Sequence, residues 1–242
     1  MDLSIVIPVF NESIKIGKDI RSAAAFLNDN HMEGEIIVVD DGSVDDTAEA
    51  AGSAESDLPE CAVLEIIQTK HTGKGHAVRT GMKATRGDYV MFADSGGCVP
   101  FTDIFRGLQL IKHKACDIAH GSRKMKGCHI IRSQNMYRRF CSRLFHWLVI
   151  KDMGVPAELT DTQCGFKIYR GDVGRHLYSE CIIDGYTFDI EVVLRAIKEG
   201  YTIKEFALDW VCDPDSRLSP VRNSWQILRE LLRIRRKVVK NG

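Results

Sequence analysis

Residues 3–43 read LSIVIPVFNESIKIGKDIRSAAAFLNDNHMEGEIIVVDDGS, and the order of apolar and polar segments within them predicts the fold. The apolar runs Leu3–Val9 and Glu35–Val39 have the length and composition of buried strands, and Ser13–Leu27 between them is helical in character. The same alternation continues with strands at Val63–Ile67 and Tyr89–Phe92 and helices at Asp45–Ala54 and Gly75–Ala84. Because alternating strands and helices are typical of an α/β domain, we expect a mostly parallel central sheet flanked by helices in a Rossmann-like arrangement.

The length and composition of the chain fit one large domain over residues 1–242. The 242 residues are 44% hydrophobic and 27% charged, which is enough apolar sequence to bury a core. No stretch reaches the ~18 consecutive apolar residues of a membrane-spanning helix, and the N-terminus lacks the features of a secretory signal. The sequence therefore predicts a protein that is soluble or bound peripherally to a membrane.

The second half of the chain is expected to be mixed and basic. Strands are expected near Asp117–His120 and Lys204–Val211, and helices at Arg132–Ile150, Phe188–Ile197 and Ser224–Val239. Residues 123–151 carry eight Lys/Arg and no acid, and residues 216–242 carry eight Lys/Arg and one acid. The two stretches together have a net charge of +15, which the rest of the chain balances with −15. Such an asymmetry indicates one anion-facing surface.

Polar residues follow each of the first four expected strands. These stretches are residues 8–12 (PVFNE), 40–47 (DDGSVDDT), 70–75 (KHTGKG) and 94–97 (DSGG). In open parallel sheets, ligands bind at the carboxyl ends of the strands. We therefore expect the four stretches to form one crevice.

Two of these stretches suit the parts of a nucleotide. Asp40 and Asp41 could accept hydrogen bonds from a nucleobase or a ribose, although the glycine and serine that follow them also suit a turn and a helix cap. Lys74, between two glycines at the start of a helix, suits a diphosphate. A dinucleotide-binding fingerprint is disfavoured because Val78 stands where its next glycine is expected, and a P-loop because no Ser or Thr follows Lys74.

Asp94 and Arg123 are candidates for phosphate chemistry. Asp94 ends an apolar strand, where a carboxylate could hold a divalent cation that bridges two phosphates; the alternative is a turn residue before a glycine pair. Arg123 follows Gly121-Ser122 at the end of a short expected strand. A guanidinium at such a corner suits bidentate recognition of phosphate, and the alternative is a surface arginine.

A basic and aromatic stretch covers Arg132–Ile150. Its arginines are Arg132, Arg138, Arg139 and Arg143, and helical spacing places the apolar residues between them broadly on one side. The pattern fits an interfacial helix on anionic lipid, with a solvated helix over the core or an RNA-binding helix as alternatives. Because no RNA recognition motif is present, we expect no nucleic-acid partner.

The set of motifs resembles family-2 glycosyltransferases of the GT-A fold, and within them most of all the dolichyl-phosphate β-glucosyltransferase and polyprenyl-phosphate glycosyltransferase group. The resemblance covers about residues 3–236. It is carried by residues 4–8 (SIVIP), 11–12 (NE), 40–43 (DDGS), 73–79 (GKGHAVR), 121–123 (GSR), 161–167 (DTQCGFK) and 186–191 (YTFDIE). The stretch 161–167 is the most specific of these.

The resemblance implies an enzyme that transfers a hexose from a nucleotide sugar, of the UDP-glucose or GDP-mannose type, to a polyprenyl or dolichyl phosphate with inversion. It implies that residues 1–98 bind the donor, that 99–215 bind the acceptor, and that 216–242 form a C-terminal basic amphipathic helix. The enzyme is expected to be cytoplasmic and peripheral on the cytoplasmic face of a membrane.

The resemblance also implies roles for individual residues. By this likeness the nucleoside is held by Pro8, Glu12, Asp40 and Asp41, the ribose and diphosphate lie near Lys74 and Asp94, the reacting centre faces Asp161 and Gln163, and the acceptor phosphate meets Arg123 and Arg138. We count Arg123 with Asp161 and Gln163 as candidate catalytic residues.

At one position the chain departs from the family pattern. The family usually carries Asp-x-Asp at the fourth strand end, whereas here Asp94 is followed by Ser95 and Gly96. The resemblance implies Mg²⁺ or Mn²⁺ with Asp94 as a ligand, yet a single carboxylate binds such an ion more weakly. Two other interpretations remain: a transferase that acts on a saccharide hydroxyl, and a degenerate homologue that binds nucleotide sugar without turnover.

Overall fold

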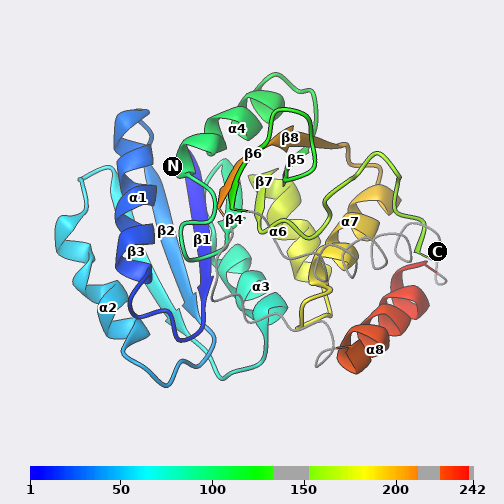
Figure 1. Ribbon diagram of the computed structural model, residues 1–242, viewed down its shortest axis with the longest axis horizontal. Coiled ribbons are helices and arrows are strands. Elements are labelled where there is room, and N and C mark those ends of the chain that lie inside the picture. The colour runs from blue at the N-terminus through cyan, green and yellow to red at the C-terminus, as the bar shows by residue number, and fades with distance from the viewer. Residues whose placement is uncertain (133–152, 212–223, 240–242) are drawn as a thin grey trace.

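The computed structural model describes residues 1–132, 153–211 and 224–239 (Figure 1). Within these ranges the main sheet has seven strands in the order β3-β2-β1-β4-β7-β5-β8. The strands are β1 (Leu3–Val9), β2 (Gly34–Asp40), β3 (Ala62–Gln68), β4 (Tyr89–Ala93), β5 (Ile118–Ser122), β7 (Phe166–Arg170) and β8 (Ile203–Ala207). The mostly parallel α/β architecture is confirmed, and the ends of the first four strands lie within one residue of the expected positions.

The central strands are covered on both faces. β1 and β2 are buried along their whole length, and their side chains alternate between two apolar cores. Leu3 and Ile5 contribute to one core, and Val6 and Ile37 contribute to the other. This two-sided burial explains why the strands have continuous apolar runs instead of alternating apolar and polar residues.

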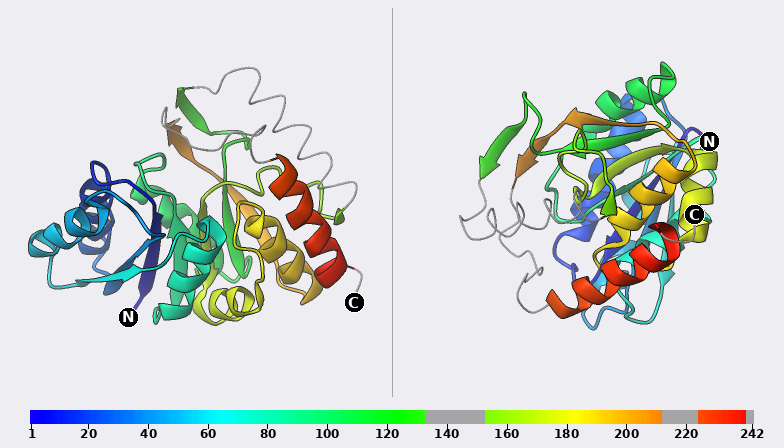
Figure 2. Two further views of the ribbon diagram at one scale, coloured as in Figure 1. Left: turned by 90° about the horizontal axis from the view of Figure 1, so that it is seen from below. Right: turned by 90° about the vertical axis from the view of Figure 1, so that its right-hand side faces the viewer.

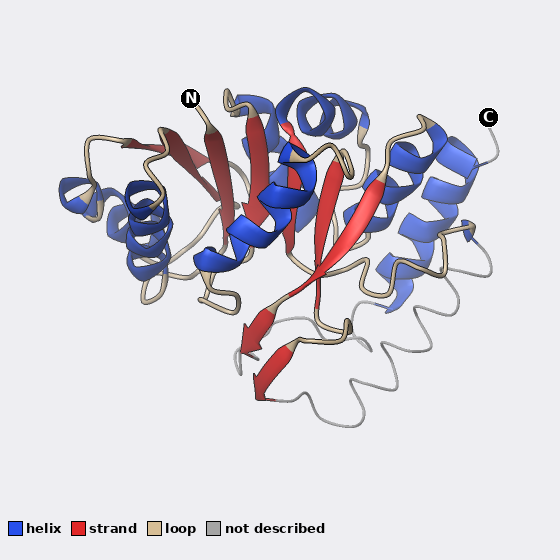
Figure 3. Cartoon of the chain, turned by 90° about the horizontal axis from the view of Figure 1, so that it is seen from above, coloured by secondary structure: helices blue, strands red, loops and turns tan. Residues whose placement is uncertain are grey.

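Helices cover the two faces as a parallel sheet requires. One core lies under α1 (Ile16–Asp29), α2 (Thr47–Ser53) and α4 (Ile104–Lys112), and the other lies under α3 (Lys74–Ala84), α6 (Gly171–Glu180) and α7 (Phe188–Lys198). Figure 3 shows the strands of the twisted sheet between these helices. The helices expected in the first half and at Phe188–Ile197 are present, whereas α4 and α6 have no counterpart in the sequence-based prediction.

The second half departs from the prediction at β7. The segment expected to be rich in turns around residues 161–167 enters a strand at Phe166, and this strand is antiparallel to both β4 and β5. Its first four residues are buried and Arg170 is exposed, because the strand lies between β4 and β5 within the sheet.

The strand expected at Lys204–Val211 is divided into β8 and β9 (Asp209–Val211). Between β8 and β9 the chain turns away from the main sheet, and two contacts hold it there. Arg106 of α4 donates a hydrogen bond to the Ala207 carbonyl (3.1 Å), and Asp103, directly before α4, accepts one from the Asp209 amide (2.7 Å). β9 then pairs in parallel with β6 (His129–Arg132) in a two-stranded ribbon that stands apart in Figure 2.

The basic helix predicted over Arg132–Ile150 is wrong at its first residue. Arg132 is the last residue of β6, where the β-branched Ile130 and Ile131 before it favour an extended chain. The other residues of that predicted helix, which include Arg138, Arg139 and Arg143, lie outside the described residues.

The order of the strands creates a crevice. From β1 the chain moves outward through β2 and β3, and it then returns to place β4 on the other side of β1. Such a topological switch point leaves a gap at the carboxyl ends of the two strands, and ligands of open α/β sheets bind there. The loops after β1 and β4, which contain Glu12 and Asp94, therefore flank the expected site.

The C-terminal segment is helical, as expected. α8 (Ser224–Ile234) continues into a π-helical turn, Arg235–Val239, and the side chains of Ile234 and Val238 are buried in the core under α7. None of the helices in the described ranges combines the length and apolar character that crossing a bilayer requires.

Candidate active site

Asp41 organises the loop that precedes α3. Its carboxylate accepts hydrogen bonds from the amides of Thr72 (3.0 Å) and Gly73 (2.9 Å) and also contacts His71 Nδ1 (2.9 Å). Gly42 permits this approach, because a Cβ there would lie 2.5 Å from the His71 amide nitrogen. The exits of the second and third strands are thus joined through a buried carboxylate.

Asp40 and the first strand exit form a second set of contacts. Asp40 accepts hydrogen bonds from the Ser43 amide (2.8 Å) and hydroxyl (2.5 Å), which are turn-stabilising contacts. The Glu12 amide donates to the Thr47 hydroxyl (2.8 Å), and Pro8 is buried within β1. The contacts of Asp40 within the protein are therefore those of the turn and capping alternative. The four predicted nucleoside residues lie along the ends of neighbouring strands.

One aromatic contact at this edge was not predicted from the sequence. The rings of Phe10 and His71 are stacked with their centroids 4.2 Å apart, and the His71 side chain is 60% exposed. The ring pair joins the loop after β1 to the loop before α3. It extends the predicted nucleoside edge with a flat aromatic pair.

Lys74 and Asp94 meet across the switch point. Lys74 begins α3, and its Nζ lies 2.6 Å from Oδ1 of Asp94, the residue that follows β4. Burial alone would lower the pKa of Lys74, but Asp94 and the nearby Asp189 raise it above its usual value. The lysine is therefore a stable cation at neutral pH.

Asp94 lies against the DTQCGFK stretch. The Asp94 amide donates to the Gly165 carbonyl (2.9 Å), and a Cβ at Gly165 would come within 2.1 Å of the Asp94 carboxyl group. Glycine at 165 is thus required for the Asp94 side chain to occupy its place. This contact brings the predicted donor and reacting-centre residues together.

Asp161 and Arg123 form a bidentate ion pair. Arg123 Nε lies 2.7 Å from Asp161 Oδ2, Nη2 lies 2.8 Å from Oδ1, and the Arg123 amide also donates to Oδ2 (3.1 Å). The Asp161 side chain is 3% exposed and that of Arg123 is 25% exposed. Glu205 in β8 supports the arrangement by accepting hydrogen bonds from the Asp161 amide and the Thr160 hydroxyl (both 2.7 Å).

The ion pair fixes the protonation of its members. Burial would raise the pKa of Asp161, but the guanidinium of Arg123 outweighs it and holds that pKa below its usual value. Asp161 is therefore an ionised carboxylate with little basicity. Gln163, two residues on, is half-buried, and none of the hydrogen bonds within the described ranges involves its side-chain amide.

A second buried ion pair lies behind this centre and was not predicted. Lys167 Nζ contacts Asp189 Oδ1 at 2.5 Å and donates to the Cys164 carbonyl at 2.7 Å, with the two charged side chains 1% and 4% exposed. Burial raises the pKa of the Cys164 thiol to about 12, so the thiol is neutral. The signal in the sequence was a lysine inside an apolar strand, FKIY, which needs a buried partner.

Asp19 in α1 anchors the loop after Asp94, and it too was missed. Its Oδ2 accepts a hydrogen bond from the Gly96 amide (2.7 Å), and its side chain is buried on the face of α1 that also carries Ile16, Ile20 and Ala23. Burial raises the pKa of Asp19 to about 6. An acid at a core position of an amphipathic helix was the available signal.

Asp19→Asn is expected to change the pH dependence of stability. The folded-state pKa of about 6 exceeds the usual aspartate value of 3.8, so the contribution of Asp19 is fully present below pH 3.8 and is lost as the pH rises through about 6. Between pH 4 and pH 7.5, the free energy of unfolding of the unmodified protein should fall by about 2 kcal/mol relative to that of the variant, because part of the contribution is already lost at pH 4. Urea unfolding at both pH values measures this difference, and a difference independent of pH would contradict it.

The loop after Cys181 connects α3 with α8. The carbonyl of Asp184 accepts from the His76 amide (3.1 Å), and the Asp184 carboxylate pairs with Arg79. On the other side, Glu230 of α8 accepts from the Thr187 hydroxyl (2.6 Å) and amide (3.2 Å). A groove of about 460 Å³ between α8 and this loop reaches Thr72 beside the start of α3.

A divalent cation finds few ligands in the described part of the site. Among the described residues, no three His, Cys, Asp or Glu side chains converge as a metal centre requires. Asp94 is paired with Lys74, and Gly96 occupies the position of the second acid. The fit to Mg²⁺ or Mn²⁺ is therefore poor, and the reaction proposed below includes no metal step.

Comparison with known proteins relates this chain to one family of enzymes. The pattern of Glycosyl transferase family 2 matches residues 4–176. The dolichyl-phosphate beta-glucosyltransferase of Dictyostelium discoideum is 30% identical over 243 residues, which cover 96% of this chain and 73% of that protein. The Homo sapiens protein of the same name is 30% identical over 247 residues, which cover 96% of this chain and 74% of that protein.

A solved structure has the same fold. Glucosyl-3-phosphoglycerate synthase from Mycobacterium tuberculosis, in complex with Mn²⁺, UDP-glucose and phosphoglyceric acid, matches with a TM-score of 0.70. The match covers 96% of this chain and 79% of the synthase at 19% sequence identity, a level at which the likeness concerns the fold.

Proposed function

Because the chain belongs to glycosyl transferase family 2, we propose that it transfers a hexose from a nucleoside-diphosphate sugar to a polyprenyl or dolichyl phosphate. The observation that carries the proposal is the match to the Dictyostelium dolichyl-phosphate beta-glucosyltransferase, which extends over 96% of this chain. UDP-glucose is the favoured donor, because the name of that relative specifies a glucosyl group.

The donor lies at the switch point in this proposal. Pro8, Glu12, Asp40 and Asp41 line the side of the nucleoside, and Lys74 faces the diphosphate. Asp41 acts through the backbone of the loop before α3, which it holds in place with two hydrogen bonds. Residues 1–98 thus form the donor half, and residues 99–215 provide the acceptor half.

The chemical step is an inverting substitution. An oxygen of the acceptor phosphate forms a bond to the anomeric carbon, and the bond from that carbon to the nucleoside diphosphate breaks, with the electron pair leaving on the diphosphate. A phosphate monoester has a second pKa near ~6 and is already largely anionic at neutral pH. The step therefore needs no general base, which agrees with the low basicity of Asp161.

Arg123 lowers the repulsion between the two anions. Its Nε and one Nη2 hydrogen are taken by Asp161, and the guanidinium has five N–H donors. Among the described residues Nη1 has no hydrogen-bond partner, so it can donate to a phosphate oxygen. Asp161 fixes the plane of the guanidinium and places negative charge near the sugar as positive charge develops there. Gln163 provides a neutral amide beside the same centre.

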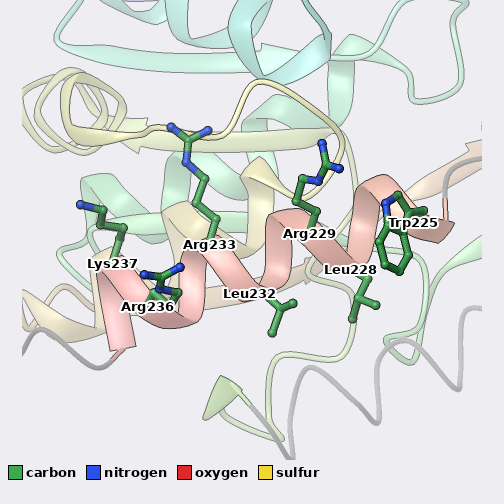
Figure 4. A pocket seen from close by; sticks show the side chains of 7 residues that line it. All are labelled: Trp225, Leu228, Arg229, Leu232, Arg233, Arg236 and Lys237. Atoms are coloured by element: carbon green, nitrogen blue, oxygen red, sulfur yellow. The ribbon is translucent and has the colours of Figure 1, made fainter.

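The acceptor lipid requires contact with a membrane, and α8 provides a suitable surface. Trp225, Leu228 and Leu232 are 70%, 47% and 51% exposed and line a shallow groove of about 520 Å³ together with Arg229 and Arg233 (Figure 4). Exposed apolar side chains flanked by arginines fit the interface of an anionic bilayer. We place the protein peripherally on the cytoplasmic face of a membrane, with α8 toward the lipid. The contact of Arg132, Arg138, Arg139 and Arg143 with anionic lipid stays a prediction from the sequence.

Replacing Trp225, Leu228 and Leu232 together by serine is expected to weaken binding to anionic vesicles about 100-fold, because the apolar area that inserts is lost. Phe105→Ser is the matched control, since Phe105 in α4 is 53% exposed on another part of the surface. Vesicle co-sedimentation measures both variants. Equal binding of the triple variant and the control would exclude α8 as the membrane contact.

A donor and acceptor screen tests the proposed function. UDP-glucose and GDP-mannose are each incubated with dolichyl phosphate and the protein, in EDTA and in Mn²⁺, and the lipid extract is analysed by mass spectrometry. We expect a hexosyl-phosphate lipid with UDP-glucose. No sugar-lipid from either donor under either condition would contradict transferase activity on a lipid phosphate.

A further inference from the structure

We propose that Lys74, held by Asp94, is the group that binds the diphosphate of the donor, and that Asp94 and the other described residues hold no divalent cation there. The inference rests on the proposed function, since it concerns the same donor. It assigns Asp94 as a positioning residue for Lys74 in place of its expected role as a metal ligand. Three features of the described structure support it.

The first feature is the backbone of the loop after Asp94. Gly96 has φ of +94° and Gly97 has φ of +63°, a region that residues with a side chain rarely adopt. Asp19 fixes this conformation by accepting the hydrogen bond of the Gly96 amide (2.7 Å). The loop therefore has a backbone conformation that suits glycine at the position of the second acid.

The second feature is the pairing of the remaining acid. Asp94 Oδ1 lies 2.6 Å from Lys74 Nζ, and Gly165 leaves room for the carboxyl group in this position. A cation at Asp94 would have to displace the ammonium or share its carboxylate with it, and would meet positive charge there. In the described structure, Asp94 is therefore ion-paired with Lys74.

The third feature is the position of Lys74 itself. The residue starts an 11-residue helix, and the helix dipole favours an anion at this end. Gly73 and Gly75 let the loop around Ile183–Gly185 approach, because a Cβ on either glycine would lie within 2.6 Å of its carbonyl oxygens. An ammonium has three N–H donors, so Lys74 can keep Asp94 and still donate to phosphate oxygens.

Calorimetric titration with UDP and with uridine, in EDTA and then in Mn²⁺, tests the inference. For the unmodified protein, the Kd for UDP is expected to differ by less than about threefold between the two conditions. Lys74→Met should raise the Kd for UDP about 10- to 100-fold and leave that for uridine unchanged, because only the charge-assisted bond to phosphate is lost. Lys83→Met, at the other end of α3, is the matched control and should bind UDP like the unmodified protein.

Asp94→Asn separates a positioning role from a metal-ligand role. If Asp94 positions Lys74, the variant weakens UDP binding about fivefold to the same degree in EDTA and in Mn²⁺. The inference would be overturned if the unmodified protein bound UDP only in Mn²⁺ and Mn²⁺ had no effect on the Kd of Asp94→Asn for UDP. That result would leave the proposed function intact. Failure of the unmodified protein to bind UDP or GDP under either condition would overturn both.

Discussion

Arg123→Met is expected to lower sugar-lipid formation at least about 1,000-fold, while UDP binding stays within about threefold. The acceptor phosphate and the departing diphosphate are both anionic, and Arg123 is the cation that Asp161 holds at the predicted reacting centre. The loss is therefore expected in turnover more than in donor affinity. Radiolabel transfer from UDP-glucose to dolichyl phosphate measures turnover, and calorimetry measures the affinity.

The control for this prediction separates catalysis from folding. Arg123→Met alone leaves the buried Asp161 carboxylate without its partner, which destabilises a protein by about 3–5 kcal/mol. The double variant Arg123→Met/Asp161→Asn removes both charges, so it should recover thermal stability and remain inactive. A double variant that retains more than about a tenth of the activity would show that the pair has no role in the reaction.

Asp189→Ala is expected to lower the free energy of unfolding by about 3–5 kcal/mol, because the buried Lys167 ammonium would lose its ion-pair partner. The unmodified pair is 2.5 Å apart and almost fully buried. For a chain of this size, the midpoint of thermal unfolding should fall by about 10 °C. Denaturant unfolding and thermal melting measure the two quantities.

Two further variants set the scale for that result. Lys167→Met/Asp189→Leu replaces the pair by apolar side chains and should regain much of the lost stability. Asp172→Ala breaks the 2.6 Å pair with Arg170, whose members are 66% and 46% exposed, and should cost less than about 1 kcal/mol. A cost for Asp189→Ala no larger than that for Asp172→Ala would contradict the structural role of the buried pair.

The first half of the fold was predictable because its signals are local. The strands Leu3–Val9 and Tyr89–Ala93 are continuous apolar runs, and the polar residues after them mark where the crevice opens. β7 was missed because its residues follow a stretch rich in turn-forming residues, and no local pattern indicates that a strand inserts antiparallel between β4 and β5. Strand order within a sheet depends on contacts between distant segments.

The partners of the site residues were not predictable from local sequence. Arg123 was expected to face the acceptor, yet it binds Asp161, which is 38 residues away along the chain. Lys74 and Asp94 were each assigned to the diphosphate, but their contact with one another requires the packing of α3 against the end of β4. Sequence patterns thus indicated the residue types of the site, and the fold determines which charges neutralise each other.

We propose that the acceptor is a lipid-linked phosphate. The most direct measurement compares initial rates of glucose transfer from UDP-glucose to dolichyl phosphate, to unphosphorylated dolichol and to a free saccharide, with the unmodified protein. We expect a glucosyl-phosphate lipid from dolichyl phosphate and no product from the other two acceptors. Transfer to dolichol or to the saccharide at a comparable rate would contradict it.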